Sequence, residues 1–197
     1  MSYHKNILNY LESTKTGKIL FLSDFRGLGT TSAIKMSLSR ISQTGGLKRL
    51  CHGIYVKSSK NNKKEVKIDV DDVLKAISKK HNIRLLPSGE IALYKLNIIP
   101  EMPKRLVYIT DGEPKNLKIQ DQTIIFKPST PNKLSMRGET SSLVIQALEA
   151  IGKNNVNEDI LSKLNQAITK ERKDFLLEDV AKAPAWIYDI LFKMEKN

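Results

Sequence analysis

Residues 23–57 read SDFRGLGTTSAIKMSLSRISQTGGLKRLCHGIYVK, and their pattern indicates the fold of the N-terminal part of the chain. Within it, Ile34, Leu38 and Ile41 recur at spacings of four and three residues, which places them on one side of a helix. Thr30 or Thr31 can cap this helix, and a Gly-Gly pair at 45–46 ends it. Residues 47–50 and 54–57 are then two short strands of a β-hairpin.

The residues before this stretch supply the elements that precede such a helix. Residues 3–15 have the pattern of an amphipathic helix that Gly17 ends, and residues 18–22 form a short apolar strand. Ser23 and Asp24 can cap a short helix that contains Phe25. The order helix, strand, short helix, turn, longer helix and hairpin is that of a winged helix-turn-helix, which we predict over residues 1–60.

The residues after the hairpin predict a second domain of different composition. A polar linker is expected at 61–67, followed by an α+β domain over 68–197 with a small antiparallel sheet and a helical C-terminal part. Ser88 can cap a helix there. The expected helices are 70–80, 89–96, 139–151, 158–168, 170–183 and 185–195, and the expected strands are 105–110, 117–120 and 123–127. The fold class is therefore α+β.

The charge of the chain is concentrated near the N-terminus. The whole sequence has a net charge of +12. Residues 1–60 contain ten Lys and Arg but only Glu12 and Asp24, whereas the remainder is nearly balanced. A basic segment of this kind favours a polyanionic partner. Cys51 is the single cysteine, and the sequence has neither a signal peptide nor a membrane-spanning stretch, so we expect a cytoplasmic protein without disulfides.

The outward side of the helix at 30–44 predicts DNA binding. Short hydroxyl side chains and basic side chains alternate there, and no acidic residue lies between Phe25 and Lys64. Hydroxyls can approach a groove floor, and Lys and Arg neutralise phosphate or read guanine. A plain solvated face is the alternative, but the order of elements favours double-stranded DNA as the partner. The predicted contact residues are Thr31, Ser32, Lys35, Ser39, Arg40, Lys48, Arg49 and His52.

The sequence offers little sign of catalysis. Ser88 beside Glu90 fits a helix start better than a nucleophile, and Asp111 and Glu113 fit a turn better than a metal site. The three histidines lack metal-ligand spacing, and no phosphate-binding glycine motif is present. We therefore expect no enzyme, cofactor or metal, with a nuclease built on Asp111 and Glu113 as the alternative.

Several segments together resemble a known family. They are SDF at 23–25, SLSRI at 37–41, TGGLKRLCHGIYVK at 44–57, LLPSGEIALYKLNI at 85–98 and VYITDGEPKNLKI at 107–119. Over roughly residues 5–130 the chain is similar to the AbiEi antitoxins of bacterial abortive-infection, or type IV, toxin–antitoxin systems.

The resemblance implies an antitoxin that represses its own operon and counters a nucleotidyltransferase-like toxin. It implies the same eight DNA-contacting residues, and an operator with an inverted repeat that two copies of the chain would bind. A solitary transcriptional regulator, or a module that binds a protein through its C-terminal domain, remains as an alternative. The aromatic face of the last helix, with Trp186, Tyr188 and Phe192, fits either core packing or a partner surface.

Overall fold

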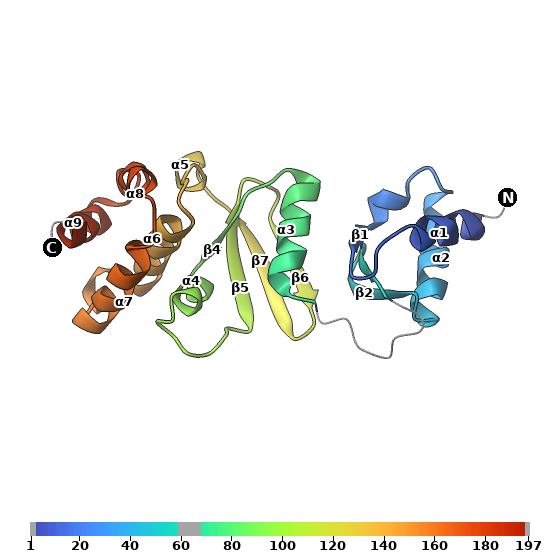
Figure 1. Cartoon of the computed structure of the whole chain (residues 1–197), viewed down its shortest axis with the longest axis horizontal. Helices are drawn as coiled ribbons and strands as arrows, with labels where there is room; N and C mark the ends of the chain where they lie inside the picture. The colour runs from blue at the N-terminus through green and yellow to red at the C-terminus, as the bar shows by residue number, and fades with distance from the viewer. Residues whose placement is uncertain (1–2, 59–67, 196–197) are drawn as a thin grey trace. The chain divides into compact units, whose positions relative to one another are not determined.

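The structure is a computed structural model that describes residues 3–58 and 68–195, so the expected linker at 61–67 lies outside the described residues. It is a mixed α+β fold in which two compact units can be distinguished, Met1–Ile77 and Ser78–Asn197. Helix α3 (Val70–His81) spans the boundary between them. Figure 1 labels most elements of each unit.

The first unit has the order of elements that its sequence predicts. They are α1 (Tyr3–Glu12), β1 (Ile19–Phe21), the 3-10 helix η1 (Leu22–Phe25), α2 (Thr31–Gln43), β2 (Leu47–Cys51) and β3 (Ile54–Lys57). The three strands form an antiparallel sheet in the order β1-β3-β2, so β3 lies in the middle and is hydrogen-bonded to both neighbours.

Local hydrogen bonds explain where the helices of this unit begin. The Thr30 hydroxyl accepts a hydrogen bond of 3.3 Å from Ala33 N, which makes Thr30 the N-cap of α2. The Asp24 carboxylate accepts one of 2.8 Å from Phe21 N at the start of η1. A single core then joins α1, α2, η1 and the sheet, with fully buried Ile7, Phe25 and Leu38 at its centre.

The second unit contains a sheet followed by a group of helices. Its elements are β4 (Leu85–Ser88), α4 (Glu90–Lys95), β5 (Arg105–Thr110), β6 (Lys115–Ile119), β7 (Gln122–Pro128), α5 (Pro131–Leu134), α6 (Glu139–Ile151), η2 (Lys153–Asn155), α7 (Glu158–Ile168), α8 (Lys173–Val180) and α9 (Ala185–Glu195). Helices α6, α7 and α9 have the bounds predicted from the sequence, whereas α8 is shorter than the predicted helix at 170–183.

The sheet of the second unit corrects two predictions. It is mixed and not antiparallel, because β5 and β7 are parallel neighbours in the order β4-β5-β7-β6. Strand β4 was not predicted; its Pro87, which has no N–H to donate, is tolerated because β4 lies at the edge of the sheet. Ser88 ends β4 and does not cap α4, whose N-cap is Gly89.

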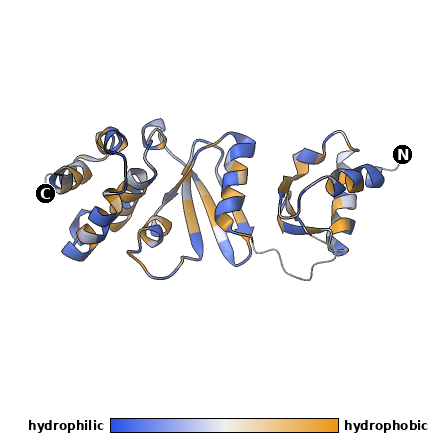
Figure 2. Ribbon diagram, viewed as in Figure 1, coloured by the Kyte–Doolittle hydropathy of each residue, from blue (hydrophilic) through white to orange (hydrophobic). Residues whose placement is uncertain are grey.

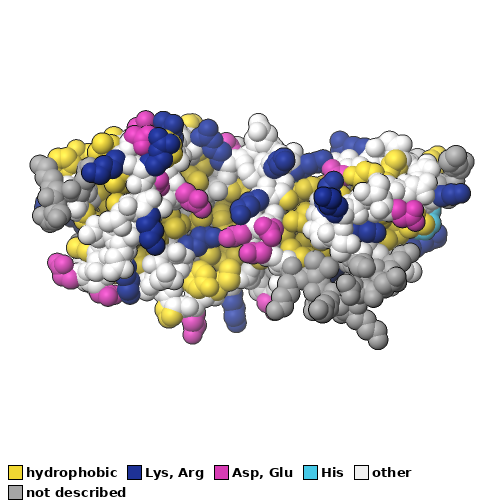
Figure 3. All heavy atoms as spheres, viewed as in Figure 1, with side chains coloured by type: hydrophobic (Ala, Val, Ile, Leu, Met, Phe, Trp, Pro, Cys, Tyr) yellow, Lys and Arg dark blue, Asp and Glu magenta, His cyan; other side chains and the backbone are white. Residues whose placement is uncertain are grey.

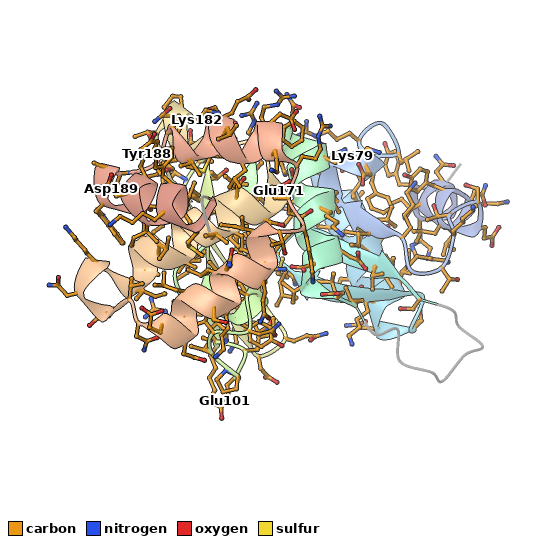
Figure 4. All side chains as sticks on the ribbon, turned by 60° about the vertical axis from the view of Figure 1, so that its left-hand side comes forward. Lys79, Glu101, Glu171, Lys182, Tyr188 and Asp189 are labelled. Atoms are coloured by element: carbon orange, nitrogen blue, oxygen red, sulfur yellow. The ribbon has the colours of Figure 1, made fainter. Side chains whose placement is uncertain are left out.

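Helix α6 is the centre of the helical part. Val144, Ile145 and Leu148 are completely buried among residues from α4, α7, α8 and α9. Figure 2 shows how hydrophobic and hydrophilic residues alternate along these helices, which gives each one an apolar side for this core. Glu171 and Lys182, labelled in Figure 4, lie in the chain on either side of α8.

Candidate nucleic-acid interface

Helix α2 exposes the residues that the sequence places on its outer side. Ile34, Leu38 and Ile41 are almost completely buried, so the opposite side of the helix faces away from the core. The five predicted contact residues of α2 are all exposed: Thr31, Ser32, Lys35, Ser39 and Arg40. The first two lie in the first turn, where unpaired backbone N–H groups and the helix dipole favour an anion.

The β2–β3 hairpin separates two adjacent basic residues onto opposite faces of the sheet. Arg49 is paired with Tyr55, whose ring belongs to the core beneath α2, whereas Lys48 is paired with Val56. Because neighbouring strand residues point to opposite faces, Arg49 lies on the α2 side and Lys48 on the other. Arg49 is exposed and Lys48 is half-buried. Of these two residues, Arg49 is therefore the one that lies on the side of α2.

The tip of the hairpin is short and basic. A bulge between Arg49 and Cys51 precedes the two-residue turn His52-Gly53. The Arg49 guanidinium lies 3.3 Å from His52 Nδ1, and Arg49 Nε donates a hydrogen bond of 3.3 Å to the Cys51 carbonyl. These contacts hold the Arg49 side chain beside the tip. Gly53 has φ +74°, a left-handed conformation that suits glycine.

A hollow of about 350 Å³ brings the helix and the hairpin together. Four predicted residues line it: Lys35 and Ser39 from α2, and Arg49 and His52 from the hairpin. Leu22 and Tyr55 give it an apolar base, and Ser42, Gln43 and Gly53 complete the lining. Thr31, Ser32, Arg40 and Lys48 do not line this hollow. The hollow thus unites part of the predicted site from two elements that are separate in the sequence.

Ser42 and Gln43 add to the predicted contact residues. Both lie on α2 one turn beyond Ser39, and positions 35, 39, 42 and 43 follow the helical spacing of one face. The Ser42 hydroxyl oxygen is shielded from solvent and has no hydrogen-bond partner within the described residues, although the residue lines the hollow.

The surface around α2 and the hairpin is poor in acidic groups. Glu12 and Asp24 are the only carboxylate side chains in residues 1–60, and the Asp24 carboxylate is bonded to Phe21 N. On the face drawn in Figure 3, Lys and Arg side chains are spread over the part of the chain near the N-terminus, and acidic side chains are sparse there. A phosphate that approaches this unit therefore meets little repulsion.

Residues considered for catalysis take structural positions. Asp111 accepts a hydrogen bond of 2.8 Å from Arg84 N, and Ser88 is paired with Val107 in the sheet. Across residues 3–58 and 68–195, no group of three or more His, Cys, Asp or Glu side chains is arranged to hold a metal ion. Within the same residues, no helix is long and apolar enough to cross a membrane.

The chain belongs to a family of unknown function, DUF6088, whose model matches residues 6–176. The matched region begins in α1 and ends in α8, so it includes both units. No curated protein matches the chain. Family membership therefore leaves the function to be argued from the site.

Proposed function

We propose that the first unit is a winged helix-turn-helix that binds double-stranded DNA, and that the protein is a transcriptional repressor of its own operon. The observation that supports this proposal most strongly is the hollow in which Lys35 and Ser39 of α2 meet Arg49 and His52 of the hairpin. A helix and a hairpin tip that present basic groups to one concave surface suit a phosphate backbone passing between them.

The fold of the unit supports the same proposal. In winged helix-turn-helix proteins a second helix enters the major groove while a hairpin touches the neighbouring backbone. Here α2 would supply Thr31 and Ser32 at its N-terminal turn, where the dipole favours phosphate. Lys35 and Arg40 would neutralise phosphates on either side, and Arg49 would hold the backbone at the hairpin tip.

The antitoxin role rests on the sequence resemblance. We propose that the second unit, cytoplasmic like the rest of the protein, counters a nucleotidyltransferase-like toxin encoded beside it. A second candidate, a protein-interaction module, is favoured by α9. Tyr188 and Phe192 are 39% and 40% exposed there, and their stacked rings lie 5.6 Å apart. Aromatic side chains exposed in this way are typical of interaction surfaces.

A gel shift of the full-length protein tests DNA binding directly. The probe would be the DNA upstream of its own gene, compared with a scrambled duplex of equal length over a range of salt concentrations. We expect selective binding to the upstream DNA that persists at physiological salt. Equal and strongly salt-sensitive binding to both duplexes would mean that the first unit binds DNA only through its positive charge. That result would contradict the repressor proposal.

A separate experiment tests the antitoxin role. The full-length protein and its Lys35→Gln/Arg49→Gln variant would each be co-expressed with the product of the adjacent gene. We expect growth to be restored by both, since neutralisation is assigned to the second unit, while only the unchanged protein represses the promoter. If neither protein restores growth, the antitoxin role is wrong even if the gel shift succeeds.

A further inference from the structure

The second unit contains its own hollow, of about 280 Å³, between the end of α4, the start of α6 and one side of α7. Its floor is apolar and is formed by Leu96, Leu143 and Ala167. Its rim is polar and cationic, and consists of Lys95, Asn97, Thr140, Lys163, Gln166 and Lys170. The hollow therefore combines an apolar surface with a ring of hydrogen-bonding groups and positive charge.

The sequence of α7 explains why so many of these groups converge. Positions 163, 166, 167 and 170 follow the spacing of one helical face, so the two lysines lie on either side of Gln166 and Ala167. Lys170 lies just beyond the end of α7, in a turn in which its N–H donates to Ala167 O at 3.2 Å. All four of these residues therefore line the hollow.

The opposite wall comes from the end of α4. Helix α4 ends at Lys95, and Asn97 follows in a left-handed conformation with φ +55°, which asparagine tolerates better than most residues. The Asn97 N–H donates to the Tyr94 carbonyl at 3.0 Å. Lys95 and Asn97, on either side of the end of α4, both line the hollow.

The charge balance of the hollow is positive. Its lining has three lysines and no carboxylate. Lys163 forms an ion pair of 2.9 Å with Asp159, but that carboxylate is 73% exposed and the pair is an ordinary i,i+4 contact in water. Glu171, the acidic neighbour of Lys170, already accepts hydrogen bonds from Thr140 N and Ser141 N at 2.8 and 3.2 Å. Neither carboxylate lines the hollow, and an anion bound there would compete with Asp159 for Lys163.

We propose that this hollow binds a small organic phosphate of the nucleoside monophosphate class. Lysine ammonium groups are established phosphate partners, and Lys163 and Lys170 would receive the phosphate. The amides of Asn97 and Gln166 can each donate and accept, as the edge of a base requires. The volume of about 280 Å³ lies just below the usual range of small-molecule sites, which favours a ligand no larger than a single nucleotide. This proposal does not rest on DNA binding by the first unit.

Calorimetric titration of the full-length protein tests the proposal with four probes: AMP, GMP, adenosine and inorganic phosphate. We expect saturable binding of a monophosphate that is at least tenfold tighter than that of adenosine or phosphate alone. In the Lys163→Gln/Lys170→Gln variant, we expect this affinity to fall about tenfold or more. The matched control is Lys118→Gln/Lys153→Gln, which removes the same charge from exposed positions outside the hollow.

Three outcomes would overturn the proposal. The first is no saturable binding of either monophosphate at millimolar concentration. The second is an equal loss of affinity in both variants, because the effect would then be one of net charge alone. The third is binding of inorganic phosphate as tightly as AMP, because the apolar floor would then contribute nothing. Circular dichroism of each variant would establish that the helices of the second unit are intact.

Discussion

The hydroxyl of Ser141 donates a hydrogen bond of 2.6 Å to the carboxylate of Asp179, a side chain with no solvent exposure. The same carboxylate accepts from the backbone N–H groups of Arg137 and Gly138 at 2.9 and 2.8 Å. Gly138, the N-cap of α6, has no side chain, so Glu171 accepts from the first-turn N–H groups of Thr140 and Ser141, while Asp179 of α8 holds the chain that enters the helix.

The Asp179→Asn substitution should destabilise the second unit. The amide replaces an oxygen acceptor with a donor that would face the N–H groups and the Ser141 hydroxyl. We expect a loss of roughly 2–3 kcal/mol in the free energy of unfolding, the range for a buried hydrogen bond to a charged group. Urea denaturation would measure it. Asp189→Asn, at an exposed position on α9 labelled in Figure 4, is the control and should change stability little. Equal effects of the two changes would contradict the role of Asp179 in holding the chain that enters α6.

Arg49 and Lys48 should differ in their importance for DNA binding, although they are neighbours of like charge. Arg49 lies on the α2 side of the sheet and lines the hollow with Lys35, whereas Lys48 lies on the opposite face. We expect Arg49→Gln to weaken operator binding by roughly 1–3 kcal/mol. The slope of log K against log salt concentration should become shallower by about one. Fluorescence anisotropy over a salt series would measure both quantities.

Two controls belong with that experiment. Lys48→Gln removes the same charge one residue away, and Lys5→Gln removes it from the exposed side of α1. Both should weaken binding far less than Arg49→Gln. If Lys48→Gln has the larger effect, the side of the sheet that faces DNA has been assigned incorrectly.

Substitutions at Thr30 and Thr31 should have different effects, the first on stability and the second on DNA affinity. The Thr30 hydroxyl caps α2 through Ala33 N, whereas Thr31 is exposed in the first turn. We expect Thr30→Ala to reduce the free energy of unfolding by about 1 kcal/mol and Thr30→Ser to restore it. Thr31→Ala should leave stability nearly unchanged and weaken DNA binding. Thermal unfolding would measure stability, and fluorescence anisotropy on the same samples would measure DNA affinity. A loss of stability in Thr31→Ala, with none in Thr30→Ala, would contradict these roles.

Local sequence patterns were sufficient wherever an element is determined by its own residues. The apolar spacing of α2, α6, α7 and α9, and the caps and glycines at their ends, predicted those helices closely. Helix α5 was missed although Thr130 caps it and Pro131 opens it, because four residues give no periodicity. The parallel pairing of β5 and β7 was also missed, because the residues of a strand do not indicate which distant strand pairs with it.

The candidate site shows the same limit. The helical spacing of α2 and the alternation along β2 indicated which side chains are exposed, and the strand alternation already separates Lys48 from Arg49. Neither pattern could bring Lys35 close to His52, which depends on how the hairpin packs on α2. The hollow at α7 was missed altogether, because its walls come from three helices that are far apart in the sequence.

Gly53 should be required for the shape of the hairpin tip. Its φ of +74° is costly for residues with a β-carbon, and its carbonyl accepts a hydrogen bond of 2.8 Å from Leu22 N. We expect Gly53→Ala to cost roughly 1–2 kcal/mol of stability and to weaken DNA binding, since Gly53 lines the hollow beside His52. Gly53→Asn should cost less, because asparagine adopts this conformation more readily. An added β-carbon would lie 3.8 Å from the nearest atom, Leu22 Cβ, so steric overlap does not account for the loss. Equal melting temperatures for the two variants would show that backbone conformation is not the cause.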